Sequence, residues 1–377
     1  TDLTLDWFKN KRDNDKPFLT FYLHKAPHRA WWPSPEKFAE FYNKKFPEPE
    51  TLFDDYSNRG TAAKTAEMNL LTHMQYMQDS KVRPSVFEKM ENVEPKIVYA
   101  RGDGTFFEPS SNSFNNRYNR ANDEQKKKYD VTLDKISKDF EANWPNMTNK
   151  EKMQWKFQRY MQDYLATISS VDDNVGRVLD YLEETGLDKN TIVVYTSDQG
   201  FYLGEHGWFD KRFIYEESFQ MPLIIRYPEK INGGGVCSDI VSNVDFAPTL
   251  LDIAGLPSPS YMQGRSFLKL LMGKTPPNWA QIAYHRYWMH KDLQHNVYAH
   301  YGVRDQRYKL IYWYNEGLGI PGATDEVEPP EWEFFDCVED PLELINCYGD
   351  SRYSDEVSRM RALLDAKMSE IGDVPRH

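Results

Sequence analysis

The sequence has no long hydrophobic run and no excess of positive charge, and each absence excludes a class of partner. No stretch approaches the roughly 18 consecutive apolar residues of a membrane-spanning helix, so we expect no membrane partner. With 58 acidic against 46 basic residues the net charge is −12, which argues against a nucleic-acid partner. An anionic ligand would need a local cationic pocket to overcome this negative field.

Cysteine is also scarce. The three cysteines, Cys237, Cys337 and Cys347, lack the spacing of a metal site. Cys337 and Cys347 are close enough in sequence to form a disulfide, but two free thiols fit equally well. The first residues, TDLTLDWFKNKRDNDKPF, resemble neither a signal peptide nor a natural start. The 377 residues, 40% of them hydrophobic, suffice for one large α/β domain and a smaller one.

Polar side chains follow a predicted strand in the middle of the chain. Ile192 to Tyr195 is an apolar, β-branched run typical of a buried strand, and Asp198 and Gln199 come shortly after it. Ligands of open α/β sheets bind beyond the carboxyl ends of strands. A carboxylate beside an amide carbonyl offers the hard oxygen atoms that Ca²⁺ and Mg²⁺ prefer. The pattern therefore predicts a metal site.

The loop after this position carries further polar groups. Gly200 and Gly204 let it turn tightly. A second apolar strand, Pro222 to Tyr227, follows the loop. The polar residues that the loop presents are Glu205, His206, Asp210 and Lys211. A strand, an acidic tip, a glycine loop with His and Lys, and a strand together indicate a site for a metal and an anion.

The same stretch resembles the formylglycine-dependent sulfatase family of the alkaline-phosphatase superfamily. Its members carry Asp-(His/Asn/Gln)-Gly, often L-G-E-H-G, then a Lys and a P-L-I strand. The matching segments here are Asp198-Gln199-Gly200, Leu203 to Gly207, Lys211, and Pro222-Leu223-Ile224. The match is specific because several elements recur in order. It implies an α/β fold with a mixed central sheet flanked by helices, and a small C-terminal subdomain of antiparallel sheet plus helix.

A second part of the resemblance lies near the beginning of the chain. Phe18 to Leu23 is predicted as an apolar strand, and His24-Lys25-Ala26-Pro27-His28-Arg29 follows it. In sulfatases a similar strand leads to a His that contacts the sulfate or donates a proton near it. His28 is the better match and His24 the competitor, although many relatives have His-x-Pro where this chain has His28-Arg29-Ala30. The alternative interpretation is two surface histidines in a turn.

The resemblance implies a role for each candidate residue. Sulfate ester hydrolysis must stabilise negative charge on the sulfuryl group and protonate a poor leaving group. Ca²⁺ needs about six to eight oxygen ligands, so two metal ligands are only part of a site. The implied assignments are His28 and Lys211 as catalytic residues, Asp198 and Gln199 as Ca²⁺ ligands, and His206, His300 and His24 as substrate contacts.

The rest of the family's site is not found in the sequence. Sulfatases also have an Asp-Asp pair on the first strand and a Cys or Ser in C/S-x-P-x-R that is oxidised to formylglycine. No Cys or Ser of this chain stands in that pattern. The chain thus resembles the C-terminal part of a sulfatase, with the formylglycine expected in an N-terminal segment that it lacks. We expect this polypeptide alone to be inactive.

The resemblance also predicts how the chain is divided. Residues 1–272 would be the C-terminal portion of the catalytic domain, including a helical insertion at 115–162, and 273–377 the small α+β subdomain. Periodic apolar positions predict a helix from Lys156 to Thr185, in which we interpret Asp172 and Asp173 as structural. Other predicted elements are helices at Thr61–Ser80 and Ser354–Gly372, a helix capped by Asp245, and strands at Ala283–Tyr287 and Gly302–Tyr314.

These observations predict a sulfuric ester hydrolase that removes sulfate from a sulfated carbohydrate resembling a glycosaminoglycan. One alternative is a phosphodiesterase or phosphonate monoester hydrolase of the same superfamily. Another is a non-catalytic carbohydrate-binding remnant, disfavoured because Asp198, Gln199, Lys211 and His28 are costly polar groups to keep together without a ligand. The family is usually periplasmic or secreted, or lysosomal in eukaryotes. The sequence does not specify the sugar, the sulfate position or the oligomeric state.

Overall fold

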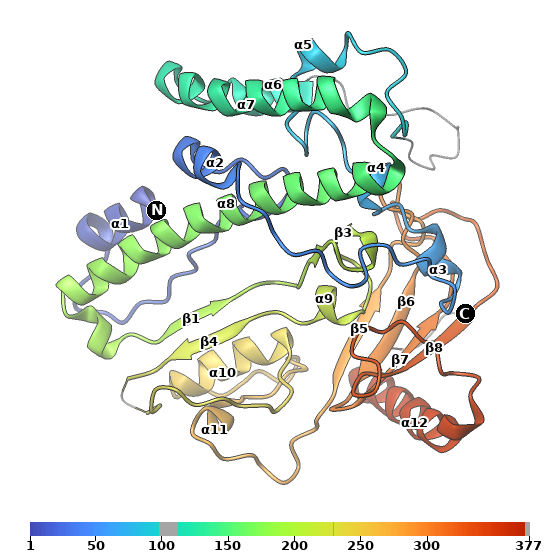
Figure 1. Cartoon of the computed structure of the whole chain (residues 1–377). Helices are drawn as coiled ribbons and strands as arrows, with labels where there is room; N and C mark the ends of the chain where they lie inside the picture. Colours follow the sequence, from blue (N-terminus) through green and yellow to red (C-terminus); the bar gives the residue numbers. More distant parts are fainter. Residues whose placement is uncertain (98–111, 229, 374–377) are drawn as a thin grey trace. The chain divides into compact units, whose positions relative to one another are not determined.

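The computed structural model describes residues 1–97, 112–228 and 230–373 (Figure 1). By contacts between Cα atoms the chain divides into two compact units. Unit 1 comprises Thr1–Phe53, Met68–Thr191 and Leu203–Asp210. Unit 2 comprises Asp54–Glu67, Ile192–Tyr202 and Lys211–His377. Among the described residues, no helix is both long and apolar enough to cross a membrane.

Unit 1 is helical, and its longest helix starts earlier than the sequence predicted. α8 runs from Asn149 to Glu184 instead of starting at Lys156. A capping box sets the start, since Glu151 N–H donates to Thr148 Oγ1 and Thr148 N–H donates to the Glu151 carboxylate. The predicted insertion is thus continuous with α8. α2 (Pro35–Phe41) packs against both α8 and α7 (Asp123–Asn143) (Figure 1).

The shorter helices show where local patterns mislead. The helix predicted at Thr61–Ser80 is largely wrong, because only α3 (Thr61–Thr65) and α4 (Leu70–His73) form. Ala66 is extended and ends α3, while the side chain of Asn69 accepts the N–H of Leu71 and starts a separate turn. The remaining short helices of unit 1 are α1 (Asp2–Asp6), continued by a π-helical turn (Trp7–Lys11), α5 (Pro84–Phe87) and α6 (Asn112–Tyr118).

The strand predicted at Phe18–Leu23 does not form. The segment is irregular, and Leu19, Phe21 and Leu23 are 64%, 68% and 83% exposed. An apolar run becomes a strand only where another strand supplies its backbone hydrogen bonds. No strand pairs with this run in the part of the chain that the structure describes. The histidines that follow it therefore do not stand at a strand end here.

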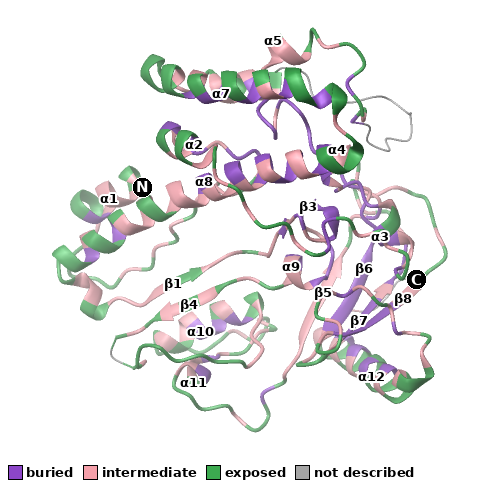
Figure 2. Ribbon diagram, in the orientation of Figure 1, coloured by how far each residue is buried: buried purple, intermediate pink, exposed green. Residues whose placement is uncertain are grey.

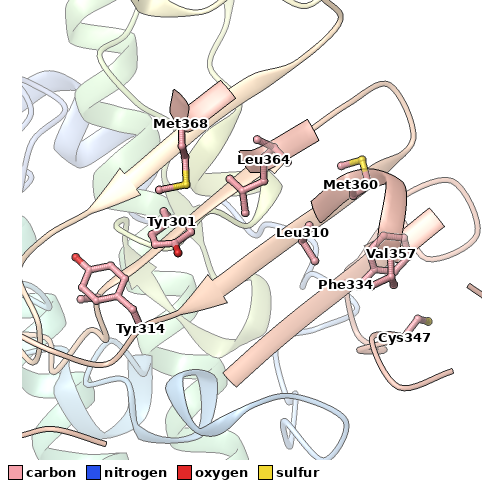
Figure 3. Packing of buried hydrophobic residues seen from close by; sticks show 11 residues of the cluster. Tyr301, Leu310, Tyr314, Phe334, Cys347, Val357, Met360, Leu364 and Met368 are labelled. Carbon is pink, nitrogen blue, oxygen red and sulfur yellow. The ribbon is translucent and has the colours of Figure 1, made fainter. Parts of the chain in front are cut away.

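Unit 2 contains the predicted C-terminal sheet. Its strands β5 (Ala283–Tyr287), β6 (His300–Arg304), β7 (Tyr308–Trp313) and β8 (Glu331–Asp336) are antiparallel neighbours in that order. α12 (Ser354–Ile371) covers one face with Val357, Met360 and Leu364 (Figure 3). β6 to β8 are mostly buried (Figure 2).

The central strands are also in unit 2. β1 (Val193–Thr196) pairs with β4 (Leu223–Arg226), with Thr196 opposite Leu223. The apolar composition predicted a buried strand, but Val194, Tyr195 and Ile224 are 43% to 65% exposed, since β1 and β4 form a sheet of only two strands. The contact-based units therefore place these strands with the C-terminal sheet, and the boundary predicted at 272 stays a prediction.

The remaining elements are short or flank this strand pair. A capping box between Ser242 and Asp245 precedes α10 (Phe246–Ile253), and Asp245 also accepts the N–H of Arg265 at 2.7 Å. The predicted structural role of Asp245 is thus confirmed. The other elements are β2 (Tyr202–Leu203), β3 (Phe209–Asp210), α9 (Glu216–Phe219) and α11 (Leu268–Leu271). All three cysteines are free thiols.

Candidate active site

The two predicted metal ligands stand on the turn that leaves β1. Asp198 is exposed and Gln199 half-buried. The hydroxyl of Ser197 donates to Oδ1 of Asp198 at 3.3 Å, and hydrogen bonding to a carboxylate favours its charged form. The carboxylate and the amide oxygen are thus open to a ligand on the surface of unit 2.

The backbone after this turn is held against α9. Gly200 N–H donates to the carbonyl of Ser218 at 2.9 Å, and Phe201 N–H donates to the carbonyl of Glu217 at 2.6 Å. A Cβ atom on residue 200 would lie 2.1 Å from the carbonyl oxygen of Glu217. The close approach requires glycine, which explains the third residue of the Asp-Gln-Gly motif.

The Lys211 segment contacts the same helix. Arg212 N–H donates to Oγ of Ser218 at 3.0 Å, and the ammonium of Lys211 lies 5.8 Å from the centre of the Phe201 ring. Arg212 has a φ of 107°, an unfavourable backbone conformation for a residue with a side chain. α9 thus brings Asp198, Gln199 and Lys211 into one local arrangement.

Arg212 is fixed at its side chain as well. Its guanidinium donates to Nε2 of His295 at 3.1 Å, so Nδ1 of that ring carries a proton and donates to Asp292 at 2.8 Å. Burial would raise the pKa of the Asp292 carboxyl, but the hydrogen bond from His295 and its positive neighbours hold it below its usual value. Sequence reasoning named neither His295 nor Asp292 as part of the site.

His300, a predicted substrate contact, is fully buried in unit 2. Its Nδ1 lies 2.8 Å from the carbonyl of Tyr298 and therefore donates, while its Nε2 has no hydrogen-bond partner among the described residues. Its ring centre is 5.3 Å from that of His285 and 4.4 Å from that of Trp313. Burial lowers the pKa of His300 well below its ordinary value and the pKa of His285 to about 4, so both rings are neutral. The substrate role of His300 stays a prediction.

His24 and His28 lie in unit 1, in the irregular segment after residue 23. His28 is exposed, and its Nδ1 lies 2.9 Å from the carbonyl of Arg29, so Nδ1 donates and Nε2 remains for a ligand. The Arg29 guanidinium binds the buried carboxylate of Asp79 through two hydrogen bonds, which anchors the residue beside His28. His24 is half-buried against Tyr22, and burial lowers its pKa.

His206 also lies in unit 1 and is fully buried. Its φ is 55°, its N–H donates to Oγ1 of Thr51 at 2.9 Å, and its ring packs 5.2 Å from that of Trp208. Gly204 has a φ of 104°, and a Cβ there would lie 2.7 Å from the ring of Phe157. The L-G-E-H-G motif is therefore a tightly packed turn, and the substrate contact of His206 stays a prediction.

Sequence reasoning also missed a buried ionic cluster in unit 2. The ammonium of Lys309 lies 2.8 Å from the carboxylate of Glu216 and 2.6 Å from that of Glu343. Ligand atoms of Glu216, Cys337 and Glu343 lie within 4.8 Å of one another, a spacing that suits a metal. Lys309 already supplies the positive charge, and burial raises the pKa of the Cys337 thiol to about 12, so it stays protonated. We interpret the cluster as structural.

Comparison with known proteins decides the family. The sulfatase family model matches residues 1–256, and the model of the C-terminal part of N-sulphoglucosamine sulphohydrolase matches residues 204–370. The chain belongs to the sulfatase family. This confirms the predicted family and the α/β fold class.

Two curated sulfatases are similar over almost the whole chain. The N-acetylglucosamine-6-O-sulfatase of Bacteroides thetaiotaomicron is 40% identical over 375 residues, covering 99% of this chain and 61% of the relative. The ulvan-active sulfatase of Formosa agariphila is 28% identical over 386 residues, covering 94% of this chain and 57% of the relative. The chain therefore spans about three fifths of the length of these sulfatases.

One solved structure matches the whole fold. It is that of a protein in complex with its substrate D-glucosamine-2-N,6-O-disulfate, and it superimposes with a TM-score of 0.86 at 39% identity. The match covers 99% of this chain and 69% of that protein. The phosphonate monoester hydrolase of Silicibacter pomeroyi matches less well, with a TM-score of 0.50 and 25% identity over 60% of this chain.

Proposed function

We propose that this chain carries part of the active site of a sulfuric ester hydrolase that removes sulfate from a sulfated, glucosamine-containing carbohydrate of the glycosaminoglycan type. The observation that carries the proposal is the structural match over 99% of the chain to a protein bound to D-glucosamine-2-N,6-O-disulfate. The 40% identity to an N-acetylglucosamine-6-O-sulfatase supports the same sugar and favours the 6-O position. A periplasmic or secreted enzyme, or a lysosomal one in a eukaryote, would meet such a substrate.

The proposal includes a calcium ion at the turn after β1. The donors fit, because the exposed carboxylate of Asp198 and the amide oxygen of Gln199 are hard oxygen ligands on neighbouring residues. They are two of the about six to eight oxygens that Ca²⁺ requires. When bound, the ion stabilises negative charge on the sulfuryl group.

Lys211 and His28 would supply the remaining chemistry of this chain. The ammonium of Lys211 would bind a sulfate oxygen and favour the developing charge. His28 would protonate the leaving oxygen through Nε2, because the carbonyl of Arg29 already engages Nδ1. The nucleophile is not among these residues, since no Cys or Ser of the 377 stands in the family's formylglycine pattern.

The similarity to a phosphonate monoester hydrolase keeps one alternative open. Such an enzyme would use the same metal ligands and lysine on a phosphonate ester. The two functions differ in the product, because one releases sulfate from a sugar and the other an alcohol from a phosphonate. A non-catalytic carbohydrate-binding protein would bind the sulfated sugar and release nothing.

Product analysis tests the proposal. The protein as its source produces it, and the 377-residue chain, are incubated with glucosamine 6-sulfate or phenyl phosphonate esters in the presence of Ca²⁺. We expect the source protein to release sulfate, and the 377-residue chain to bind the sulfated sugar without releasing sulfate. Release of phenol alone would favour the alternative enzyme. Failure of both proteins to bind the sulfated sugar more tightly than the unsulfated one would overturn the proposal.

A further inference from the structure

We infer that Ser218 is a positioning residue that holds the metal-binding turn and the Lys211 segment in one arrangement. The inference rests on the proposed function, because it concerns how unit 2 presents Asp198, Gln199 and Lys211 to a metal and a sulfate. Ser218 touches neither ligand. Its role is to fix the backbone of both segments that do.

Ser218 uses two different oxygen atoms for the two segments. Its carbonyl accepts the N–H of Gly200 at 2.9 Å, directly after Gln199. Its hydroxyl oxygen accepts the N–H of Arg212 at 3.0 Å, directly after Lys211. Ser218 is only 6% exposed, so water competes little for these bonds. One residue therefore sets the spacing between the metal ligands and the lysine.

The hydroxyl bond supports a backbone that would not adopt its conformation unaided. Arg212 has a φ of 107°, which an L-residue keeps only where its surroundings hold it. The Ser218 hydroxyl holds the N–H side of that residue, and the backbone of Arg212 also accepts a hydrogen bond from His285. Loss of the hydroxyl would let this backbone relax and turn the adjoining Lys211 away from its present direction.

Ser218 can act as a fixed point because α9 is anchored on both sides. A four-residue helix has little stability of its own. Glu216 secures its start, since its N–H donates to Glu343 at 2.7 Å and its carboxylate pairs with Lys309 at 2.8 Å and Arg304 at 3.1 Å. The ring of Phe219 at its end lies 5.7 Å from that of His285. The buried ionic cluster thus ties Ser218 to β7, and through Ser218 the site to the C-terminal sheet.

Three variants of the full chain test the inference. Ser218→Ala removes the hydroxyl and keeps the carbonyl that binds Gly200. Ser218→Thr keeps a hydroxyl and serves as the conservative rescue. Ser358→Ala is the control, because the Ser358 hydroxyl makes a bond of similar length, 2.9 Å to the carbonyl of Ser354, on the exposed side of α12.

Calcium and glucosamine 6-sulfate affinities are measured by calorimetry for each variant. We expect Ser218→Ala to weaken both by about fivefold, the effect of one lost hydrogen bond. Ser218→Thr should restore most of the affinity, and Ser358→Ala should leave it unchanged. Equal affinities in Ser218→Ala and the unsubstituted chain would overturn the inference. Absence of calcium and sugar binding in the unsubstituted chain would instead overturn the proposed function.

Amide hydrogen exchange separates positioning from a general loss of stability. In Ser218→Ala the Arg212 amide should exchange faster, while the Gly200 amide, bonded to the retained carbonyl, should stay protected. Equal acceleration at both positions and across unit 2 would mean that the serine acts only on stability, and the inference would fail. If Ser218→Ala does not fold, Ser218→Cys, with similar volume and a weak acceptor, is measured in the same way.

Discussion

Lys309 and Glu343 form an ion pair in the interior of unit 2, with Nζ 2.6 Å from Oε1 and exposures of 0% and 1%. Burial would lower the pKa of Lys309, but Glu343 and Glu216 together raise it, so the ammonium is retained. Burial raises the pKa of Glu343 despite the attraction of Lys309. Each charge is therefore tolerated only because the other is present.

Removal of one partner should be far more harmful than removal of both. We expect Lys309→Met to lower the free energy of unfolding by about 3–5 kcal/mol, because Glu216 and Glu343 then share a site without a cation. The double variant Lys309→Met/Glu343→Gln should recover a large part of that loss. Urea unfolding measures both. A loss below about 1 kcal/mol in the single variant would contradict the pairing, since that is the value of an exposed ion pair.

The buried histidines predict how stability depends on pH. Burial lowers the pKa of His285 from its ordinary 6.5 to about 4, so between these values the unfolded chain binds a proton that the folded chain does not. Stability is therefore complete above the unfolded pKa and falls as pH falls toward 4. Replacement by His285→Asn should reduce the loss between pH 7 and 4.5 by up to roughly 3 kcal/mol, measured by urea unfolding. An identical pH profile in the variant would contradict the neutral ring.

The glycine of the Asp-Gln-Gly motif offers a steric test. Gly200→Ala would place a Cβ 2.1 Å from the Glu217 carbonyl oxygen, so the metal-binding turn should move away from α9. We expect calcium affinity to fall by about tenfold or more, a loss that corresponds to the about 1.4 kcal/mol of moderate backbone strain. Gly233→Ala is the matched control, since a Cβ there meets nothing within 4 Å. Equal calcium affinity in the two variants would show that the turn does not depend on this contact.

The sequence predicted the elements whose pattern is local. Alternation predicted β5 to β8, and the periodic apolar positions predicted α8 and α12, because neighbours along the chain create these patterns. The run at Phe18–Leu23 misled because pairing depends on another strand, which no local pattern reveals.

The candidate site was predictable only as far as its motifs extend. The family motifs named Asp198, Gln199 and Lys211, and the structure ties them to one helix. They gave no sign of Ser218, whose two bonds reach residues 18 and 6 positions away, or of Lys309, whose partner Glu216 lies 93 positions away. Such contacts arise from tertiary packing, so only a structure reveals them.

A calcium titration of Asp198→Asn tests the central claim, that the turn after β1 is a metal site of a sulfatase. Asp172→Asn is the control, because Asp172 is an exposed carboxylate within α8 that we interpret as structural. We predict that the unsubstituted chain and Asp172→Asn bind one Ca²⁺ with the same affinity and that Asp198→Asn loses about tenfold or more, since a charged hard ligand is lost. Unchanged calcium affinity in Asp198→Asn would contradict the account.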